Sequence, residues 1–228
     1  MLNKFISTSI IAMTFNMVLP LTAYADLSTD IHDLQTRWAK ANYELVDEAQ
    51  VNAFEALIEQ AASTTDRYPN RAESWIWRGI IQSTYAGKAG PFNALSYAKA
   101  ARKSLEKAMN IDATALDGSA YASLGTLYFK VPGWPIGFGD DDKANTLLKK
   151  AIEINPKGID SNYFYADYLS EEDNYSAAKK YLLIAKAAAS RSDRPLADKG
   201  RQQEIVALLG RVNEELKYDD TATDDELD

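Results

Sequence analysis

Residues 121–156 read YASLGTLYFKVPGWPIGFGDDDKANTLLKKAIEINP. Two amphipathic segments flank a central stretch rich in Gly and Pro, and each segment places a small residue close to a large apolar one. Gly125 precedes Tyr128 in the first segment, and Ala144 precedes Leu148 in the second. Small residues at a crossing point let two helix backbones approach closely, and large residues one turn away fill the space beside them. The stretch therefore predicts an antiparallel helix pair.

The same pattern recurs on both sides of this stretch. Upstream, Gly79 and Leu105 occupy the corresponding positions, and downstream Ala178 follows Ala144 by 34 residues, which is the repeat length of the tetratricopeptide family. A single helix pair cannot bury its apolar face alone, so neighbouring pairs must stack. The chain resembles tetratricopeptide repeat proteins, and the predicted fold is all-α: a short right-handed α-solenoid of antiparallel helix pairs.

Two insertions and two capping elements complete the predicted domain. The insertions, residues 87–92 and 131–140, lie between the two helices of a pair. A degenerate helix pair that ends at Tyr68-Pro69-Asn70 forms the predicted N-terminal cap, and a long helix over 195–217 with one apolar stripe forms the predicted C-terminal cap. Residues 218–228 hold six Asp or Glu in eleven positions, which predicts a disordered acidic tail.

The first 25 residues have the pattern of a secretory signal. One lysine is followed by an apolar run, and Ala23-Tyr24-Ala25 supplies the small, any, small pattern that signal peptidase cleaves, so the mature chain is predicted to begin at Asp26. An uncleaved membrane anchor is the alternative, but Asn16 and Pro20 interrupt a stretch already shorter than a membrane span. The predicted organisation is a signal peptide at 1–25, a helical repeat domain at 26–217 and an acidic tail at 218–228.

Composition argues against several classes of function. The chain carries 25 Lys and Arg against 33 Asp and Glu, a formal net charge of -8, which disfavours nucleic acid and anionic lipid as partners. It has no cysteine, so disulfides, thiol catalysis and thiolate metal sites are excluded. His32 is the single histidine and no phosphate-binding glycine motif occurs. We therefore predict a protein that is not an enzyme, with no cofactor and no metal.

Three consecutive carboxylates, Asp140, Asp141 and Asp142, admit two further interpretations. Oxygen ligands beside glycines can hold a calcium ion, although the alternating spacing of an EF-hand loop is absent. The same residues precede a helix that begins near Lys143, where an aspartate serves as N-cap and acidic groups favour the helix dipole. The helix start needs no additional partner and is favoured. A carboxylate hydrolase using Asp140 or Asp160 is the enzyme-class alternative, and it requires a pKa raised by burial.

The insertion 131–140 is the candidate binding element. It reads VPGWPIGFGD and places two large rings in a loop bounded by prolines. Long loops that are costly to order and rich in aromatic residues often form binding surfaces. Alternatively, Trp134 and Phe138 fill the concave face or cover the neighbouring helix pair. The sequence leaves both interpretations open.

Three segments resemble a more specific family: LGTLY at 124–128, VPGWPIGFGD at 131–140 and NPKGIDSNYFY at 155–165. They resemble exported tetratricopeptide proteins of Gram-negative bacteria, similar to the T components of tripartite ATP-independent periplasmic (TRAP) transporters, over roughly residues 70–215. The resemblance implies a periplasmic location, admits a homotrimer, and implies a cleft or pore through which a solute reaches a solute-binding protein. It assigns ligand binding to the positions that match the shared segment: Pro132, Gly133, Trp134, Pro135, Phe138, Gly139 and Asp140.

The predicted function is a periplasmic, non-catalytic scaffold. Its concave surface, edged by the two insertions, would bind a protein or peptide partner or a small apolar ligand. The alternative is an accessory subunit of a TRAP-type transport system that passes a solute to a solute-binding protein. The best-known T components are lipoproteins, whereas this chain has no cysteine to which a lipid could be attached.

Overall fold

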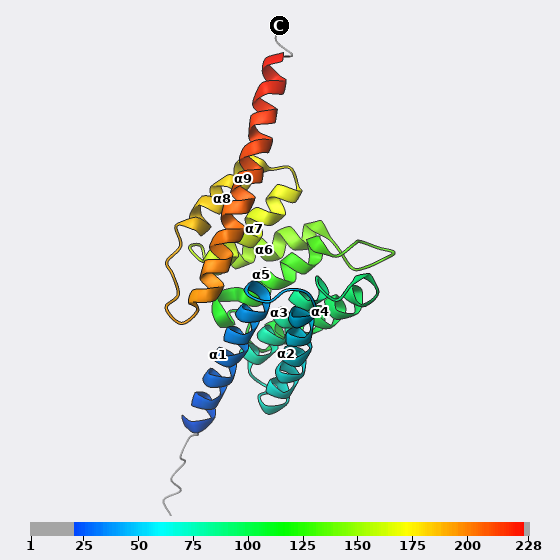
Figure 1. Ribbon diagram of the computed structural model, residues 1–228, viewed down its shortest axis with the longest axis vertical. Helices are drawn as coiled ribbons and strands as arrows, with labels where there is room; N and C mark the ends of the chain where they lie inside the picture. Colours follow the sequence, from blue (N-terminus) through cyan, green and yellow to red (C-terminus); the bar gives the residue numbers. More distant parts are fainter. Residues whose placement is uncertain (1–20, 226–228) are drawn as a thin grey trace, which may run out of the picture.

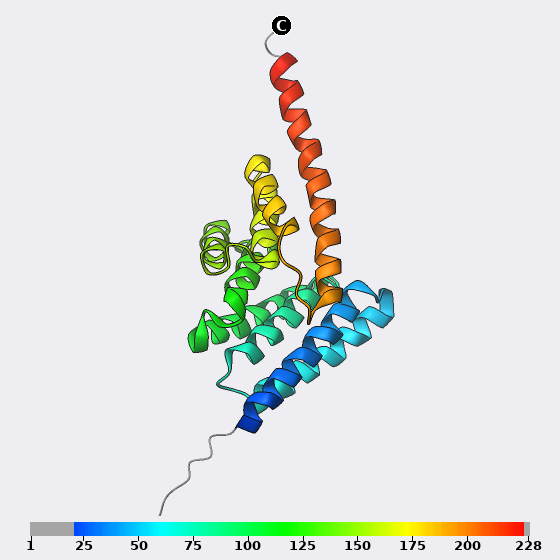
Figure 2. The same cartoon turned by 90° about the vertical axis from the view of Figure 1, so that its left-hand side faces the viewer.

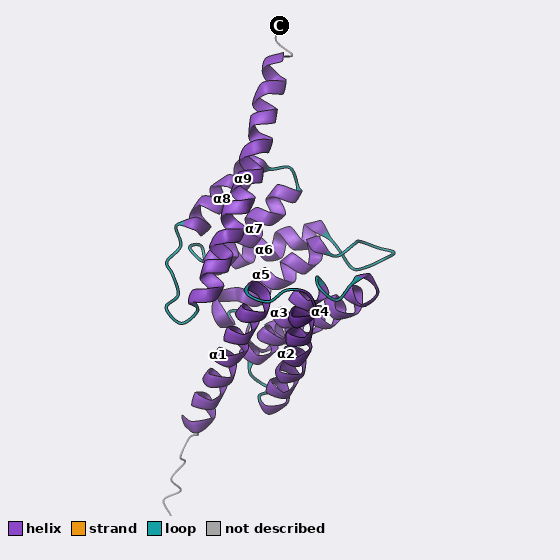
Figure 3. Ribbon diagram, in the orientation of Figure 1, coloured by secondary structure: helices purple, strands orange, loops and turns teal. Residues whose placement is uncertain are grey.

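A computed structural model describes residues 21–225, and these residues are almost entirely helical (Figure 3). Residues 1–20, which make up most of the predicted signal peptide, and residues 226–228 of the predicted tail lie outside the described residues. The helices are α1 (Leu21–Tyr43), α2 (Asp47–Arg67), α3 (Ala72–Ala86), α4 (Pro91–Asp112), α5 (Ala115–Lys130), α6 (Asp141–Ile154), α7 (Ile159–Glu171), α8 (Tyr175–Lys186) and α9 (Pro195–Asp225).

Consecutive helices pack in pairs and the pairs stack (Figure 1). Helices α3, α5 and α7 are the first helices of the three repeats. Helix α5 contacts both α3 and α7 in an inner row, and α4, α6 and α8 each pack against the first helix of their own pair. Helix α1 extends the inner row by packing against α3, and α2 covers both. The predicted all-α solenoid is confirmed, including the helix pair that caps its N-terminal end.

The repeat positions form the core of each pair. Three leucines on the second helices are fully buried: Leu105, Leu148 and Leu182. The alanine four residues before each of them is also fully buried: Ala101, Ala144 and Ala178. A Cβ atom added at Gly79 would lie 2.6 Å from Cγ of Leu105, so α3 and α4 cross at a distance that only glycine permits. The small and large residues therefore have the packing roles that the sequence pattern predicts.

The two insertions have different structures. Residues 131–140 form a loop that protrudes from the side of the molecule (Figure 1), as predicted. The first insertion contributes only a short connection, because the helix resumes at Pro91 and α4 has 22 residues against 14 in α6. Proline is well suited to the first turn of a helix, where its missing N–H is not needed. The Gly and Pro cluster at 87–92 therefore marks a helix start, and most of the additional residues of the first unit lengthen α4.

Helix α9 closes the solenoid. It packs on α8 and α7 and also returns to α1, so the two ends of the domain meet (Figure 2). A Cβ atom at Gly200 would lie 2.4 Å from the Tyr43 ring, which shows how closely α9 approaches the end of α1. The helix continues to Asp225, beyond the predicted end at Lys217, because extending an existing helix costs far less than nucleating one. Residues 218–225, predicted to be disordered, are thus helical. None of the described helices combines the length and apolar character needed to cross a membrane.

Candidate functional site

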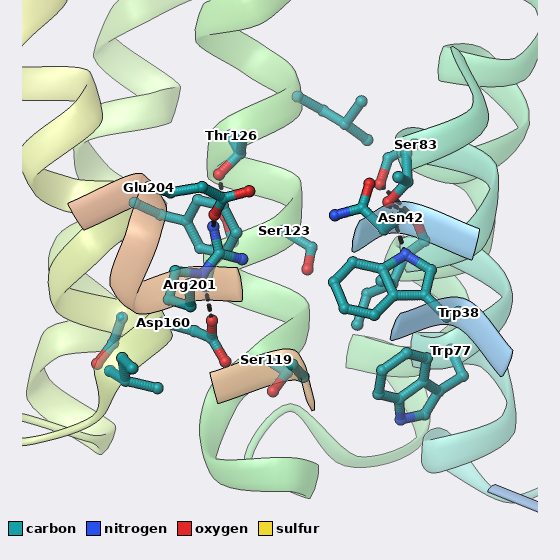
Figure 4. Close-up of a pocket in the computed structure, with 18 of the residues that line it drawn as sticks. Trp38, Asn42, Trp77, Ser83, Ser119, Ser123, Thr126, Asp160, Arg201 and Glu204 are labelled. Carbon is teal, nitrogen blue, oxygen red and sulfur yellow. Dashed lines mark hydrogen bonds and ion pairs between the residues drawn. The ribbon is translucent and has the colours of Figure 1, made fainter. Parts of the chain in front are cut away.

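A groove of about 1070 Å³ lies on the concave side of the solenoid, between the inner helices and the first part of α9 (Figure 4). Its volume is at the upper end of the range for small-molecule sites. Side chains from α1, α3, α4, α5, α7 and α9 line it. Figure 4 shows Asp160 and Arg201 on one side, Trp38 and Trp77 on the other, and Ser123 between them. We call this space the α9 groove.

Helix α5 contributes a stripe of hydroxyl groups to the α9 groove. Ser119, Ser123 and Thr126 are spaced to share one helix face, and all three line the groove. The Ser119 hydroxyl donates to the Leu116 carbonyl at 2.5 Å, and the Thr126 hydroxyl donates to a carbonyl one turn earlier. Ser123 points into the open space (Figure 4), so its hydroxyl faces any bound ligand.

The opposite wall is aromatic. The rings of Trp38 and Trp77 meet edge to face with centroids 5.9 Å apart, a favourable arrangement for two aromatic rings. Nε1 of Trp38 donates to the Thr84 hydroxyl at 3.0 Å. Trp77 is 2% exposed. Both rings are therefore fixed in the core, and the small part of each that borders the groove makes this side of it apolar.

The α9 side of the groove is held by ion pairs that centre on Asp160. One oxygen of Asp160 accepts from Arg191 at 2.7 Å and the other accepts from Arg201 at 2.9 Å. Arg201 also donates to Glu204, and Arg191 donates to Asp198 at 2.7 Å. The pairs join α7, the segment before α9, and α9 itself. They fix the position of α9 across the concave face.

These contacts bear on the acid role that the hydrolase alternative gives to Asp140 or Asp160. Burial alone would raise the pKa of Asp160, but the charges of Arg201 and Arg191 outweigh burial and hold this pKa well below its usual value. The hydrogen bonds from Lys143 lower the pKa of Asp140 in the same direction. A carboxyl group that is to act as an acid near neutral pH needs a raised pKa. Neither aspartate meets that requirement.

The start of α5 forms a strained edge of the groove. Leu116, Asp117 and Gly118 have φ values of 49°, 55° and 75°, and the first two of them line the groove. The left-handed conformation costs roughly 1 to 2 kcal/mol for a residue with a side chain. Such strain persists where the surrounding structure over-determines the backbone, which is common at binding sites.

The predicted loop residues lie mainly outside the groove. Pro132 lines the groove, as do its neighbours Val131 and Ile136. Trp134 is 89% exposed. The ring of Phe138 packs edge to face on Tyr128, with centroids 5.6 Å apart, and the Arg102 guanidinium lies 4.5 Å from its centre. Phe138 therefore covers the neighbouring helix pair, as the alternative interpretation states, whereas Trp134 faces solvent.

The remaining loop positions maintain the loop itself. Gly133 and Gly139 form an isolated bridge, and the bond before Pro135 is cis. The Asp140 carboxylate accepts from the backbone N–H of Lys143 at 3.0 Å, so the helix-start interpretation is confirmed. The assignment of ligand binding to the seven loop residues stays a prediction. The arrangement brings only Pro132 among them to the α9 groove.

Replacing Trp134 with Ala is expected to leave the fold intact. Because the ring faces solvent, its removal should change the free energy of unfolding by no more than about 0.5 kcal/mol. Thermal unfolding followed by circular dichroism measures this, and Trp38→Ala serves as the matched core variant, with an expected loss of about 3 kcal/mol. A loss of similar size in Trp134→Ala would show that the loop ring belongs to the core.

Sequence reasoning missed the α9 side of the groove. Arg201 lies in the predicted capping helix and Arg191 in the connection before it, and the sequence presents Asp160 only as a candidate acid. A usable signal is nonetheless present, because Arg201 falls within the apolar stripe of α9, four residues before the buried Ile205. A charged residue at a core position requires a buried partner of opposite charge.

No protein-family model matches the chain, and no curated protein matches it. Among solved structures, the crystal structure of MamA protein is similar, with 17% sequence identity and a TM-score of 0.42 over 85% of this chain and 93% of that chain. The resemblance to TRAP T components therefore stays a prediction. What the α9 groove does must be inferred from its own geometry.

Proposed function

We propose that this protein is a non-catalytic, periplasmic scaffold that binds a short extended segment of a peptide or partner protein in the α9 groove. The supporting observation is the groove itself, about 1070 Å³ in volume and enclosed by the inner helices and α9. Solenoid proteins present their concave faces for binding. This fold adds a wall, α9, held against that face by the ion pairs of Asp160.

The dimensions and chemistry of the groove fit an extended peptide. The α5 face from Ser119 to Thr126 is roughly 10 Å long at about 1.5 Å per residue, which matches about three residues of extended chain at about 3.3 Å each. Hydroxyl groups on this face supply hydrogen-bond partners for a peptide backbone. The aromatic wall of Trp38 and Trp77 receives side chains of the peptide. In an extended peptide, backbone groups would bond to the hydroxyl face of α5, and side chains would pack against the aromatic wall.

The second candidate function is an accessory subunit of solute transport. It is favoured by the enclosure of the groove, whose volume is close to the upper limit for small-molecule sites. In this case the groove would hold a small solute and release it to a solute-binding protein. The two candidates share the same site and differ in its occupant.

Ser123→Trp tests both candidates by filling the groove. The side chain of Ser123 points into the open space (Figure 4), so an indole there should abolish binding while the helix itself is preserved. The binding partners to test are mixed-sequence pentapeptides, measured by isothermal titration calorimetry. The expected weakening exceeds about tenfold, since tenfold corresponds to only about 1.4 kcal/mol.

Ser176→Trp is the matched control, because Ser176 is exposed on α8 and does not line the groove. Its affinity for the peptides should equal that of the unsubstituted protein. If the unsubstituted protein binds no peptide, the scaffold proposal fails. If native mass spectrometry then finds a small molecule that Ser123→Trp no longer retains, the transport alternative is supported.

A further inference from the structure

Two buried hydrogen-bond donors in the α9 groove have no partner. They are Nε of Arg194 and Nε1 of Trp77, and neither makes a hydrogen bond to any residue that the structure describes. Both side chains line the groove. Because a buried donor left unpaired costs free energy, nearly all such groups in folded proteins are paired. Two unpaired donors at one place therefore require an explanation.

The two donors belong to side chains in contact. The Arg194 guanidinium carbon lies 5.2 Å from the centre of the Trp77 ring. Trp77 is fixed by its contact with Trp38. The backbone at Arg194 is fixed by a turn, in which its N–H donates to the Arg191 carbonyl at 3.0 Å and its own carbonyl accepts from the Asp198 N–H at 3.0 Å. The Trp77 ring and the backbone at Arg194 are therefore held in place without a ligand, and the ring contact sets the position of the guanidinium.

Nearby carboxylates do not neutralise Arg194. Asp160 and Asp198 already accept hydrogen bonds from Arg191, and no carboxylate in the described part of the chain lies within 4.0 Å of the Arg194 guanidinium. Asp160, Asp198 and Asp193 attract it only from a greater distance. Burial and the charge of Arg191 lower the pKa of Arg194, the direction expected for a cation whose anionic partner is missing.

We propose that Arg194 and Trp77 bind a carboxylate group of the ligand. This inference rests on the proposed function of the α9 groove and specifies what part of the occupant is recognised. A carboxylate accepts hydrogen bonds only, the indole N–H donates only, and the guanidinium presents several donors in a planar fork that matches two carboxylate oxygens. The carboxylate is the free C-terminus of a peptide or the acid group of a small organic molecule.

Paired probes test the proposal by calorimetry. One pair is a set of mixed-sequence pentapeptides with a free C-terminus and the same set with a C-terminal amide. The other pair is hexanoate and hexanamide. The acid should bind at least about tenfold more tightly than its amide, since charged hydrogen bonds are roughly twice as strong as neutral ones. Acid and amide peptides that bind equally would overturn the carboxylate site but leave the scaffold proposal intact.

The source of the carboxylate is decided by which pair binds. Selective binding of the peptide acids assigns the site to a C-terminus. Selective binding of hexanoate with no binding of either peptide set supports the carboxylate site and overturns the peptide scaffold. Binding of none of the four probes overturns both proposals.

Variants separate recognition from structural support. Arg194→Gln should remove the preference for acid over amide, and Trp77→Phe, which loses only the N–H and part of the ring, should reduce it severalfold. Arg211→Gln, an exposed arginine of α9 outside the groove, should leave it unchanged. The stability of the unliganded protein provides a second readout. If Arg194 serves the ligand, Arg194→Gln should unfold at the same temperature or higher; a clear decrease would show that it is a structural counterion of the Asp160 network and would overturn the proposal.

Discussion

Replacing Asp160 with Asn should destabilise the protein by about 2 to 3 kcal/mol, because Arg191 and Arg201 each lose a charged hydrogen bond and keep only one carboxylate partner. Asp160 is shared by Arg191 and Arg201, and Arg201 is only 8% exposed. An asparagine can accept a hydrogen bond from one arginine but carries no charge to balance either. Chemical denaturation at neutral pH measures the loss of unfolding free energy.

The effect of Asp160 should also depend on pH. Its pKa in the folded protein is held below the usual value by Arg201 and Arg191, so the unfolded chain binds a proton at this position more readily than the folded chain. The stabilisation is complete above the ordinary aspartate pKa of about 3.9 and is lost as the pH falls below it. The difference in stability between the unsubstituted protein and Asp160→Asn should therefore stay constant near neutral pH and shrink in acid.

Asp33→Asn is the control for this prediction. Asp33 pairs with Arg37 one turn away on the surface of α1, and both side chains are about half exposed. A surface pair of this kind contributes no more than about 1 kcal/mol, so Asp33→Asn should lose much less unfolding free energy than Asp160→Asn. Equal losses in the two variants would mean that the Asp160 network does not hold α9 in place.

The repeat units could be predicted from sequence because their packing is local and periodic. Gly125 and Leu148 lie in neighbouring helices of one pair, and the same positions recur in the units before and after it. Each unit repeats the same backbone crossing, so the register found in one unit applies to the next. The same reasoning predicted that one of the three aspartates at 140–142 caps the next helix, and Asp140 does so by accepting from the N–H three positions away.

The groove could not be predicted because its contacts are not local. Asp160 and Arg201 are 41 residues apart, and no repeat relates them. The apolar stripe of α9 predicts that one face is buried, but it does not specify that α9 returns to α1. The aromatic loop at 131–140 was predicted to bind a ligand because its composition is unusual. In the structure, Trp134 is exposed and Phe138 covers a helix pair. Composition alone does not distinguish these roles.

Replacing Gly125 with Val is expected to cost about 3 kcal/mol through overpacking. A Cβ atom at this position would lie 2.7 Å from Cγ of Leu148 and 3.2 Å from its backbone nitrogen. Leu148 is fully buried and cannot move aside without displacing its neighbours, and the nitrogen belongs to the helix backbone. The helices α5 and α6 would have to separate, which would also move the Ser119 to Thr126 face that lines the groove.

Gly210→Val is the matched control, because no atom beyond the adjacent backbone of α9 lies within 4 Å of the position that a Cβ atom would take at Gly210. Valine is a better helix former than glycine by a few tenths of a kcal/mol, so this variant should unfold at the same temperature or slightly higher. Thermal unfolding of the two variants therefore compares the same change, glycine to valine, at a helix crossing (Gly125) and on an open helix face (Gly210). If Gly125→Val were as stable as Gly210→Val, close contact between α5 and α6 would not be the reason for glycine at position 125. The packing argument behind the fold prediction would then be wrong for this unit.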